Sequence, residues 1–206
     1  MSIVKLNNNG VKNATAFGSI TGLGSMTFIK KLTASSSATL SFVDGSSGVT
    51  LDNSYKEYIF TFKNMHPATQ SGFLFNASID SGSNYNVAKT TTAFNTAHNP
   101  DSGGTNLGYE STYDLANGTG FQILDQNSQG TDNDNSLAGI LHLFNPSSSV
   151  FVKHFLCQTI NKSGNVWVNR TFVAGYINSI SPVDAVQFKF GSGNIDAGDI
   201  CLYGIA

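Results

Sequence analysis

The chain has 206 residues, of which 40% are hydrophobic and only 12% are charged, and its formal net charge is −2 at pH 7. The hydrophobic content is enough for a core, but the charged fraction is about half that of an average soluble domain, which disfavours long solvent-exposed helices. A single arginine and scattered lysines argue against a nucleic-acid partner, which requires clustered positive charge. We expect no membrane span and no signal peptide, because no apolar run is long enough for either.

Residues 1–25 are predicted to form an extended N-terminal arm. Turn-forming polar residues and glycines separate isolated apolar residues there, so neither helical nor strand periodicity persists. Such a segment cannot bury itself, and it becomes ordered only against a neighbouring subunit. The residues predicted to attach this arm to an assembly are Lys5, Leu6, Val11 and Phe17.

From residue 26 onward the sequence has the alternation of β-strands. Tyr58, Phe60 and Phe62 would share one face of a strand, and residues 73, 75, 77 and 79 would do the same in the next one. Turn clusters rich in Gly, Ser, Asn and Asp separate these segments from further strands, predicted at 150–157, 166–177, 183–190 and 200–205. We expect one all-β domain over residues 26–206, an antiparallel, jelly-roll-like β-sandwich of about ten strands without helices.

Residues 97–136 are rich in Asn, Asp, Gly and Ser and are predicted to form a long loop, which in a compact domain is usually functional or mobile. From Asp125 onward this loop has oxygen-bearing side chains at positions 1, 3, 5 and 9 of a calcium-binding pattern. Ser136 occupies the twelfth position, where a bidentate glutamate belongs, and no helices flank the segment. A solvated acidic loop is the default interpretation, and the alternative is a weak calcium site with Asp125, Asn127 and Asp132.

No catalytic motif is present, so we expect no enzymatic activity. The chain has only two glutamates, Glu57 and Glu110, and no pair of carboxylates has a spacing typical of glycosidases. Nucleophile elbows, His-Glu-x-x-His pairs and phosphate-binding glycine loops are also absent from the sequence. Cys157 and Cys201 lie in apolar stretches, which favours buried free thiols over a disulfide.

The four histidines are spread along the chain. His142 and His154 lie on predicted strands and could meet across a sheet to bind a metal, although partly buried, hydrogen-bonded histidines are the favoured interpretation. His66 and His98 are predicted to lie in loops, because a proline follows each of them closely. Apart from calcium, no cofactor is predicted.

Three tyrosines outside the predicted core faces, Tyr85, Tyr109 and Tyr113, are candidates for contact with a glycan. Flat aromatic rings can stack on sugars, and the neighbouring Asn and Asp side chains can hydrogen-bond to hydroxyl groups. The alternative is that these rings pack over the ends of the sandwich.

Several strings together resemble a family of small virion structural, tail-fibre-like proteins of marine tailed bacteriophages, including cyanophages. The strings are residues 25–42, 55–64, 80–94, 138–148, 172–177, 186–195 and 202–205, so the likeness spans nearly the whole chain. The resemblance implies a virion protein that is made in the bacterial host cytoplasm and contacts other virion proteins and itself. It supplies no catalytic or binding residues.

Two functions follow as expectations. The first is a non-enzymatic structural component of the tail fibre, baseplate or capsid surface, anchored by the arm and forming a symmetric homo-oligomer, with a trimer as the first guess. The alternative is a receptor-recognition domain that binds host surface polysaccharide. A depolymerase would need a carboxylate pair that the sequence does not present.

Overall fold

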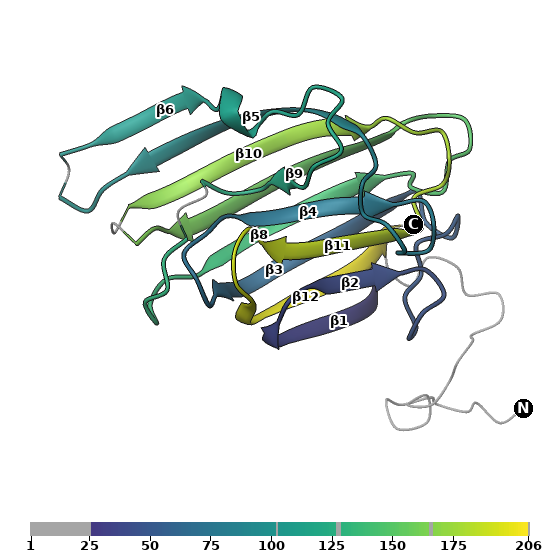
Figure 1. The fold of residues 1–206 in the computed structure, drawn as a ribbon, viewed down its shortest axis with the longest axis horizontal. Coiled ribbons are helices and arrows are strands. Elements are labelled where there is room, and N and C mark those ends of the chain that lie inside the picture. Colours follow the sequence, from purple (N-terminus) through teal and green to yellow (C-terminus); the bar gives the residue numbers. More distant parts are fainter. Residues whose placement is uncertain (1–25, 102, 127–128, 165–166, 206) are drawn as a thin grey trace, which may run out of the picture.

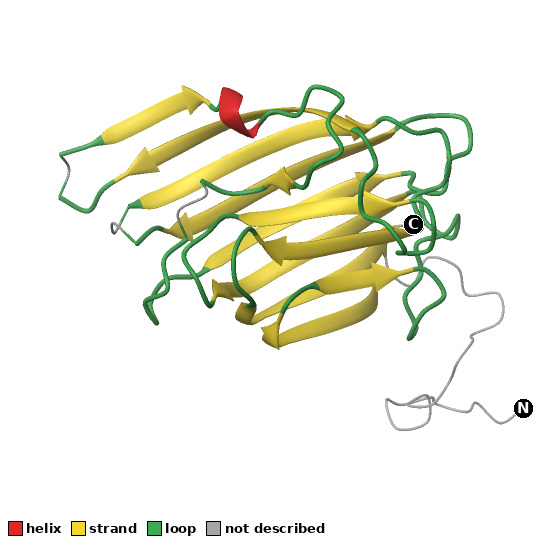
Figure 2. Ribbon diagram, in the orientation of Figure 1, coloured by secondary structure: helices red, strands yellow, loops and turns green. Residues whose placement is uncertain are grey.

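The structure is a computed structural model that describes residues 26–101, 103–126, 129–164 and 167–205. Figure 2 shows that the described residues form strands joined by loops, with one turn of 3-10 helix, η1 (Ser111–Tyr113). Alternating apolar residues and frequent turns favour this all-β arrangement. The strands are β1 (Met26–Ser37), β2 (Leu40–Val43), β3 (Glu57–Pro67), β4 (Phe73–Ser78), β5 (Lys89–His98), β6 (Thr105–Tyr109), β7 (Gln122–Ile123), β8 (Leu137–Phe144), β9 (Lys153–Lys162), β10 (Val168–Ile177), β11 (Ala185–Phe190) and β12 (Ile195–Ile205).

Two antiparallel sheets pack face to face (Figure 1), which confirms the predicted β-sandwich. The large sheet has the order β1-β12-β3-β8-β9-β10-β5-β6, and the small sheet has the order β2-β11-β4-β7. From β1 to β5 the chain alternates between the two sheets, which is the crossing pattern of a jelly roll. Strands β8, β9 and β10 instead form a meander within the large sheet.

Aromatic rings from both sheets form the core. Phe188 of the small sheet lies at its centre, and five other phenyl rings have their centroids 5.2–6.4 Å from its own. These rings belong to Phe42, Phe60, Phe62, Phe73 and Phe75, all of them buried. Because alternate residues of a strand point to the same face, the predicted row at positions 58, 60 and 62 of β3 faces this core.

Several expected boundaries were wrong. Ile79 does not continue the buried row of β4, because the strand ends at Ser78 and the chain turns there, leaving Ile79 exposed. Val150 and Phe151 lie in the turn before β9, and both are exposed. The strand begins at Lys153 and runs to Lys162, because pairing with β10 extends it beyond its apolar part.

The region 97–136 is not one long loop, since it contains β6, η1 and β7 within its described residues. His66 lies in β3 and His98 ends β5, so the prediction that both are loop residues was wrong. Strand pairing overrides the turn tendency of the nearby prolines in both cases. The predicted arm, with Lys5, Leu6, Val11 and Phe17, lies outside the described residues.

Candidate functional site

The large sheet has two faces of different character. Its inner face packs on the small sheet over part of its width, and β5, β6 and β10 extend beyond that cover (Figure 1). On β10 the side chains of Asn169, Thr171 and Val173 are buried on this inner side. Those of Val168, Arg170 and Phe172 point to the outer face, on which no element of the described chain packs.

Apolar side chains dominate the outer face over strands β8, β9, β10, β5 and β6. Phe94 is 43% exposed, Leu156 is 50% exposed and Ile160 is 48% exposed, although all three lie in central parts of long strands. The rings of Phe94 and Phe172 stack with their centroids 4.6 Å apart, and Leu107 lies beyond them on the edge strand β6. This part of the sheet therefore presents exposed apolar side chains with polar ones such as Gln158, Arg170 and Thr96 between them, and we call it the outer face patch.

Polar side chains lie between the apolar ones on this face, and several of them are paired with neighbours. Arg170 donates from Nη2 to Gln158 Oε1 at 2.8 Å, and its guanidinium lies over the Phe172 ring. His142 Nδ1 lies 2.5 Å from Glu57 Oε1, and both side chains are half-buried. Since Gln158 and Phe172 are uncharged, Arg170 keeps its positive charge, and Glu57 carries a negative charge on the same face.

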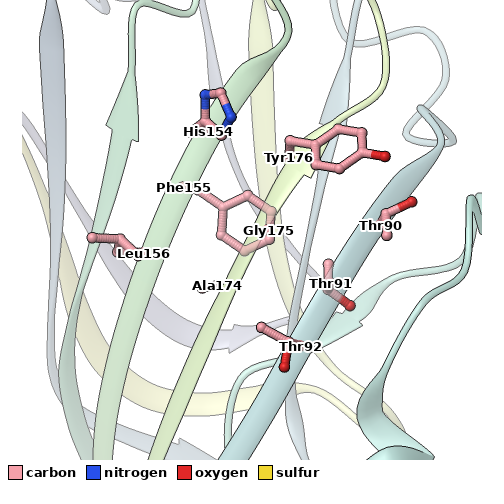
Figure 3. A pocket seen from close by; sticks show the side chains of 9 residues that line it. All are labelled: Thr90, Thr91, Thr92, His154, Phe155, Leu156, Ala174, Gly175 and Tyr176. Atoms are coloured by element: carbon pink, nitrogen blue, oxygen red, sulfur yellow. The ribbon is translucent and has the colours of Figure 1, made fainter.

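A shallow apolar hollow of about 360 Å³ lies on the outer side of β9, β10 and β5 (Figure 3). His154, Leu156 and Tyr176 border it, while Ala174 and Gly175 leave space in the middle. Gly175 is required by the neighbouring strand instead: it is in phase with the buried Val173, and an added Cβ would lie only 2.6 Å from the Thr90 carbonyl oxygen on β5. The hollow is wide enough to accept a side chain from a partner surface.

A second, polar pocket of about 400 Å³ lies on the inner side, beyond the cover of the small sheet. We call it the amide pocket, because carboxamides from three segments line it. Its lining residues are Ala97, Asn106, Tyr113, Gln126, Ser163, Trp167 and Asn169. None of them is charged.

Strand register brings polar side chains together beside this pocket. Asn169 of β10 lies opposite Ala97 of β5 and Asn161 of β9, and Thr171 lies opposite Asn95 and Thr159. Asn106 of β6 donates from Nδ2 to Asn95 Oδ1 at 3.2 Å. A polar stripe therefore crosses the inner face where apolar residues would be expected.

Two aromatic rings complete the amide pocket. The Trp167 ring is in close contact with Gly104, where a Cβ would collide with it, so the glycine fixes the position of the indole. Tyr113 packs against the core, and burial together with the charges of Glu110 and Asp125 raises its pKa to about 12. Its hydroxyl is therefore protonated at neutral pH and can donate a hydrogen bond.

The three predicted glycan-contact tyrosines do not share one surface. Tyr113 lines the amide pocket, whereas Tyr109 lies on the outer side of β6, 63% exposed and hydrogen-bonded through its hydroxyl to Asp114. Tyr85 is half-buried in the loop before β5, where its carbonyl accepts a hydrogen bond from Asn76 Nδ2 at 2.6 Å. The sequence analysis missed the polar residues at inward positions of β5 and β10, which would have indicated the amide pocket.

The two described residues among the predicted calcium ligands differ in their exposure to solvent. Asp125 is buried, and its Oδ1 accepts a hydrogen bond from the Phe73 backbone N–H at 2.9 Å, whereas Asp132 is exposed. Asn127 lies outside the described residues. Within the described part of the chain no three His, Cys, Asp or Glu side chains are grouped to hold a metal ion.

The strand histidines both lie on the outer face, but they are not opposite each other, since His142 lies opposite Leu156 and His154 opposite Tyr176. His142 is half-buried and bonded to Glu57, which confirms the favoured interpretation for this residue. His154 is exposed instead, with its ring centroid 6.3 Å from that of Tyr176. Cys157 and Cys201 are buried free thiols, as expected, and burial raises the pKa of Cys157.

Two lysines are buried without a described carboxylate partner, which the sequence did not indicate. Lys89 donates from Nζ to Asn76 Oδ1 at 2.5 Å and to the Val87 carbonyl at 2.9 Å. Lys153 donates to the carbonyls of Ser179 and Ser181. Burial lowers the pKa of both, that of Lys89 to about 8.

In the part of the chain that the structure describes, no helix has the length and hydropathy needed to cross a membrane. No protein-family model, no curated protein and no solved structure matches the chain. The resemblance to phage virion proteins therefore stays a prediction.

Proposed function

We propose that the chain is a non-enzymatic structural component of a bacteriophage particle, at the tail fibre, baseplate or capsid surface, and that it assembles through the outer face patch. The assembly part of the proposal is carried by the exposure of Phe94, Leu156 and Ile160 in a wide sheet, and the phage setting rests on the sequence resemblance alone. Monomeric soluble proteins rarely expose a contiguous apolar patch larger than a few hundred Å². Burying this surface in an assembly would remove it from water.

A second copy of the chain is the proposed occupant of the outer face patch. Arg170 keeps its positive charge, since its neighbours Gln158 and Phe172 are uncharged, and Glu57 beside His142 carries a negative charge elsewhere on the face. Two copies can therefore approach each other in orientations that keep their Arg170 side chains apart. Interfaces between identical subunits are also more apolar than other interfaces, and closed symmetric assemblies are their common form.

The hollow beside Gly175 gives such an interface a specific feature. A side chain from the partner can enter it and contact Leu156 and Tyr176, which border the space. Aromatic anchors seated in pockets near the centre of an interface supply most of its binding free energy. Exposed aromatic rings of the same patch on the second copy, such as Phe94, are the side chains that would enter the hollow.

Light scattering of the full chain tests the assembly. We expect a closed oligomer for the wild type and a monomer for Leu156→Asp, because the aspartate would place a charge in the buried interface. The matched control is Asn53→Asp, which changes the charge by the same amount in an exposed turn and should leave the oligomer intact. A monomeric wild type, or an oligomer that tolerates Leu156→Asp, would contradict assembly through this face.

The role of residues 1–25 stays a prediction, and it has a separate test. Phage particles produced with a chain that begins at residue 26 should lack the protein, while the truncated domain should still fold when it is expressed alone. Quantitative mass spectrometry of purified particles measures the copy number. A normal copy number of the truncated chain would argue against attachment through the arm.

A receptor-recognition role is compatible with this assembly. The amide pocket opens on the inner side of the large sheet, so a self-associated outer face leaves it accessible.

A further inference from the structure

The amide pocket is a formed cavity for which the proposed assembly has no use. Its volume of about 400 Å³ lies in the range of small-molecule sites, about 300–1,000 Å³. Segments far apart in the sequence build it: β5 and β6 supply Ala97 and Asn106, and the start of β10 supplies Asn169. Trp167 and Tyr113 provide aromatic surface beside these amides.

Buried polar groups beside the pocket are not satisfied by the described protein. Asn95 Nδ2, Asn169 Nδ2 and Thr171 Oγ1 have no hydrogen-bond partner among the described residues, although all three side chains are almost completely buried. Such groups each cost about 1–3 kcal/mol, and native proteins rarely keep several of them together without a reason. Asn169 lines the pocket itself, so a ligand with hydroxyl groups can give its amide a partner.

The charge around the pocket restricts the ligand further. Its described lining residues include neither lysine nor arginine, and the nearby carboxylates of Glu110 and Asp125 help to raise the pKa of Tyr113. An anionic ligand would meet this negative field without a positive partner. The site therefore suits an uncharged ligand with many hydroxyl groups and an apolar face for an aromatic ring.

We infer that the amide pocket binds a neutral saccharide, with Trp167 providing a stacking surface and Asn169, Asn106 and Tyr113 hydrogen-bonding to sugar hydroxyls. Carboxamides both donate and accept, which matches the mixed character of a hydroxyl group. This inference is independent of the outer face patch, which lies on the other side of the sheet.

Trp167 is the single tryptophan of the chain, so intrinsic fluorescence reports directly on the pocket. The full chain is first screened on a glycan array that carries neutral hexose and N-acetylhexosamine oligosaccharides beside sulfated and uronic-acid ones. The strongest neutral oligosaccharide is then titrated into the protein in solution. We expect saturable binding with a change in tryptophan emission.

Variants locate the site and control for folding. Asn169→Ala and Asn106→Ala should weaken binding at least about tenfold, since each removes a hydrogen-bonding side chain from the pocket lining. Tyr109→Ala is the matched control, because this tyrosine is exposed on the outer side of β6 and should leave affinity unchanged. Circular dichroism and thermal unfolding of each variant establish that it is folded.

Three outcomes would overturn the inference. They are the absence of any neutral glycan ligand on the array, binding restricted to sulfated or uronic-acid glycans, and saturable binding that Asn169→Ala and Asn106→Ala both leave unchanged while they are folded. Loss of binding in these two variants, with Tyr109→Ala retaining it, would support the inference even if the chain proved to be monomeric.

Discussion

Lys89 starts β5 with a fully buried side chain, and replacing it by methionine should remove a pH dependence of folding stability. Its ammonium group has two hydrogen-bond acceptors, Asn76 Oδ1 and the Val87 carbonyl, but burial still lowers its pKa from 10.5 to about 8. The folded protein therefore releases this proton at a lower pH than the unfolded chain does. Between about pH 8 and 10.5 the unfolded state binds more protons, so stability rises with pH in that window.

The size of this effect follows from the two pKa values. The difference between 10.5 and about 8 corresponds to a cost of about 3 kcal/mol while Lys89 is charged in the folded protein. From pH 7 to pH 9 the folded lysine loses its proton, which should add about 1 kcal/mol to the free energy of unfolding. The Lys89→Met variant should lack this increment, whatever its stability at pH 7.

Urea-induced unfolding of both proteins at pH 7, 8 and 9 measures the increment as a difference. Subtracting the two profiles cancels other titrations, including that of Cys157, whose raised pKa makes stability fall with increasing pH once the unfolded thiol ionises. Lys56→Met is the matched control, because Lys56 is exposed, and its profile should parallel that of the wild type. Parallel profiles for the wild type and Lys89→Met would refute the assignment.

Three further predictions concern the core, the sheet and the thiols. Phe188→Ala should lower the free energy of unfolding by about 3–5 kcal/mol in urea titrations, since it removes the ring that joins both sheets, and a loss below about 1 kcal/mol would contradict this role. Gly175→Ala should cost about 1–3 kcal/mol because its Cβ would collide with β5, whereas Gly120→Ala has open space and should change stability by less than about 0.5 kcal/mol; equal losses would argue against the clash. Cys157 and Cys201 should react with a thiol reagent only after denaturation, and rapid labelling of the native protein would show that they are accessible.

The sandwich could be predicted from the sequence because its strands alternate clearly. Tyr58, Phe60 and Phe62 occur at every second position, and this period alone puts them on one buried face. The boundaries of β9 could not be predicted in the same way. Its second half is polar, and only pairing with β10 and β8 continues the strand to Lys162. Conversely, the apolar residues Val150 and Phe151 continue the strand pattern in the sequence, although they lie in the turn before β9.

The amide pocket was harder to predict, because a polar residue at an inward position looks like an outward one until the register is known. Asn169 and Thr171 alternate in phase with the buried Val173, and this phase was the available signal. A single strand does not reveal its neighbours, however, so the approach of Asn95 from β5 could not be inferred. Tyr113 was predicted to contact a glycan only because its aromatic ring lies among polar residues in the sequence. Of the three tyrosines predicted in this way, it is the one that lines the pocket.

The two edges of the large sheet differ in their protection against unwanted pairing. Strand β1 carries Lys30 and Lys31 at one edge, and charged lysines discourage another chain from adding a strand there. Strand β6 forms the other edge with Thr105–Tyr109, which contains no charged residue and pairs only with β5 among the described strands. Addition of a foreign strand is therefore favoured at β6 over β1, so the sheet is more readily extended at its β6 edge.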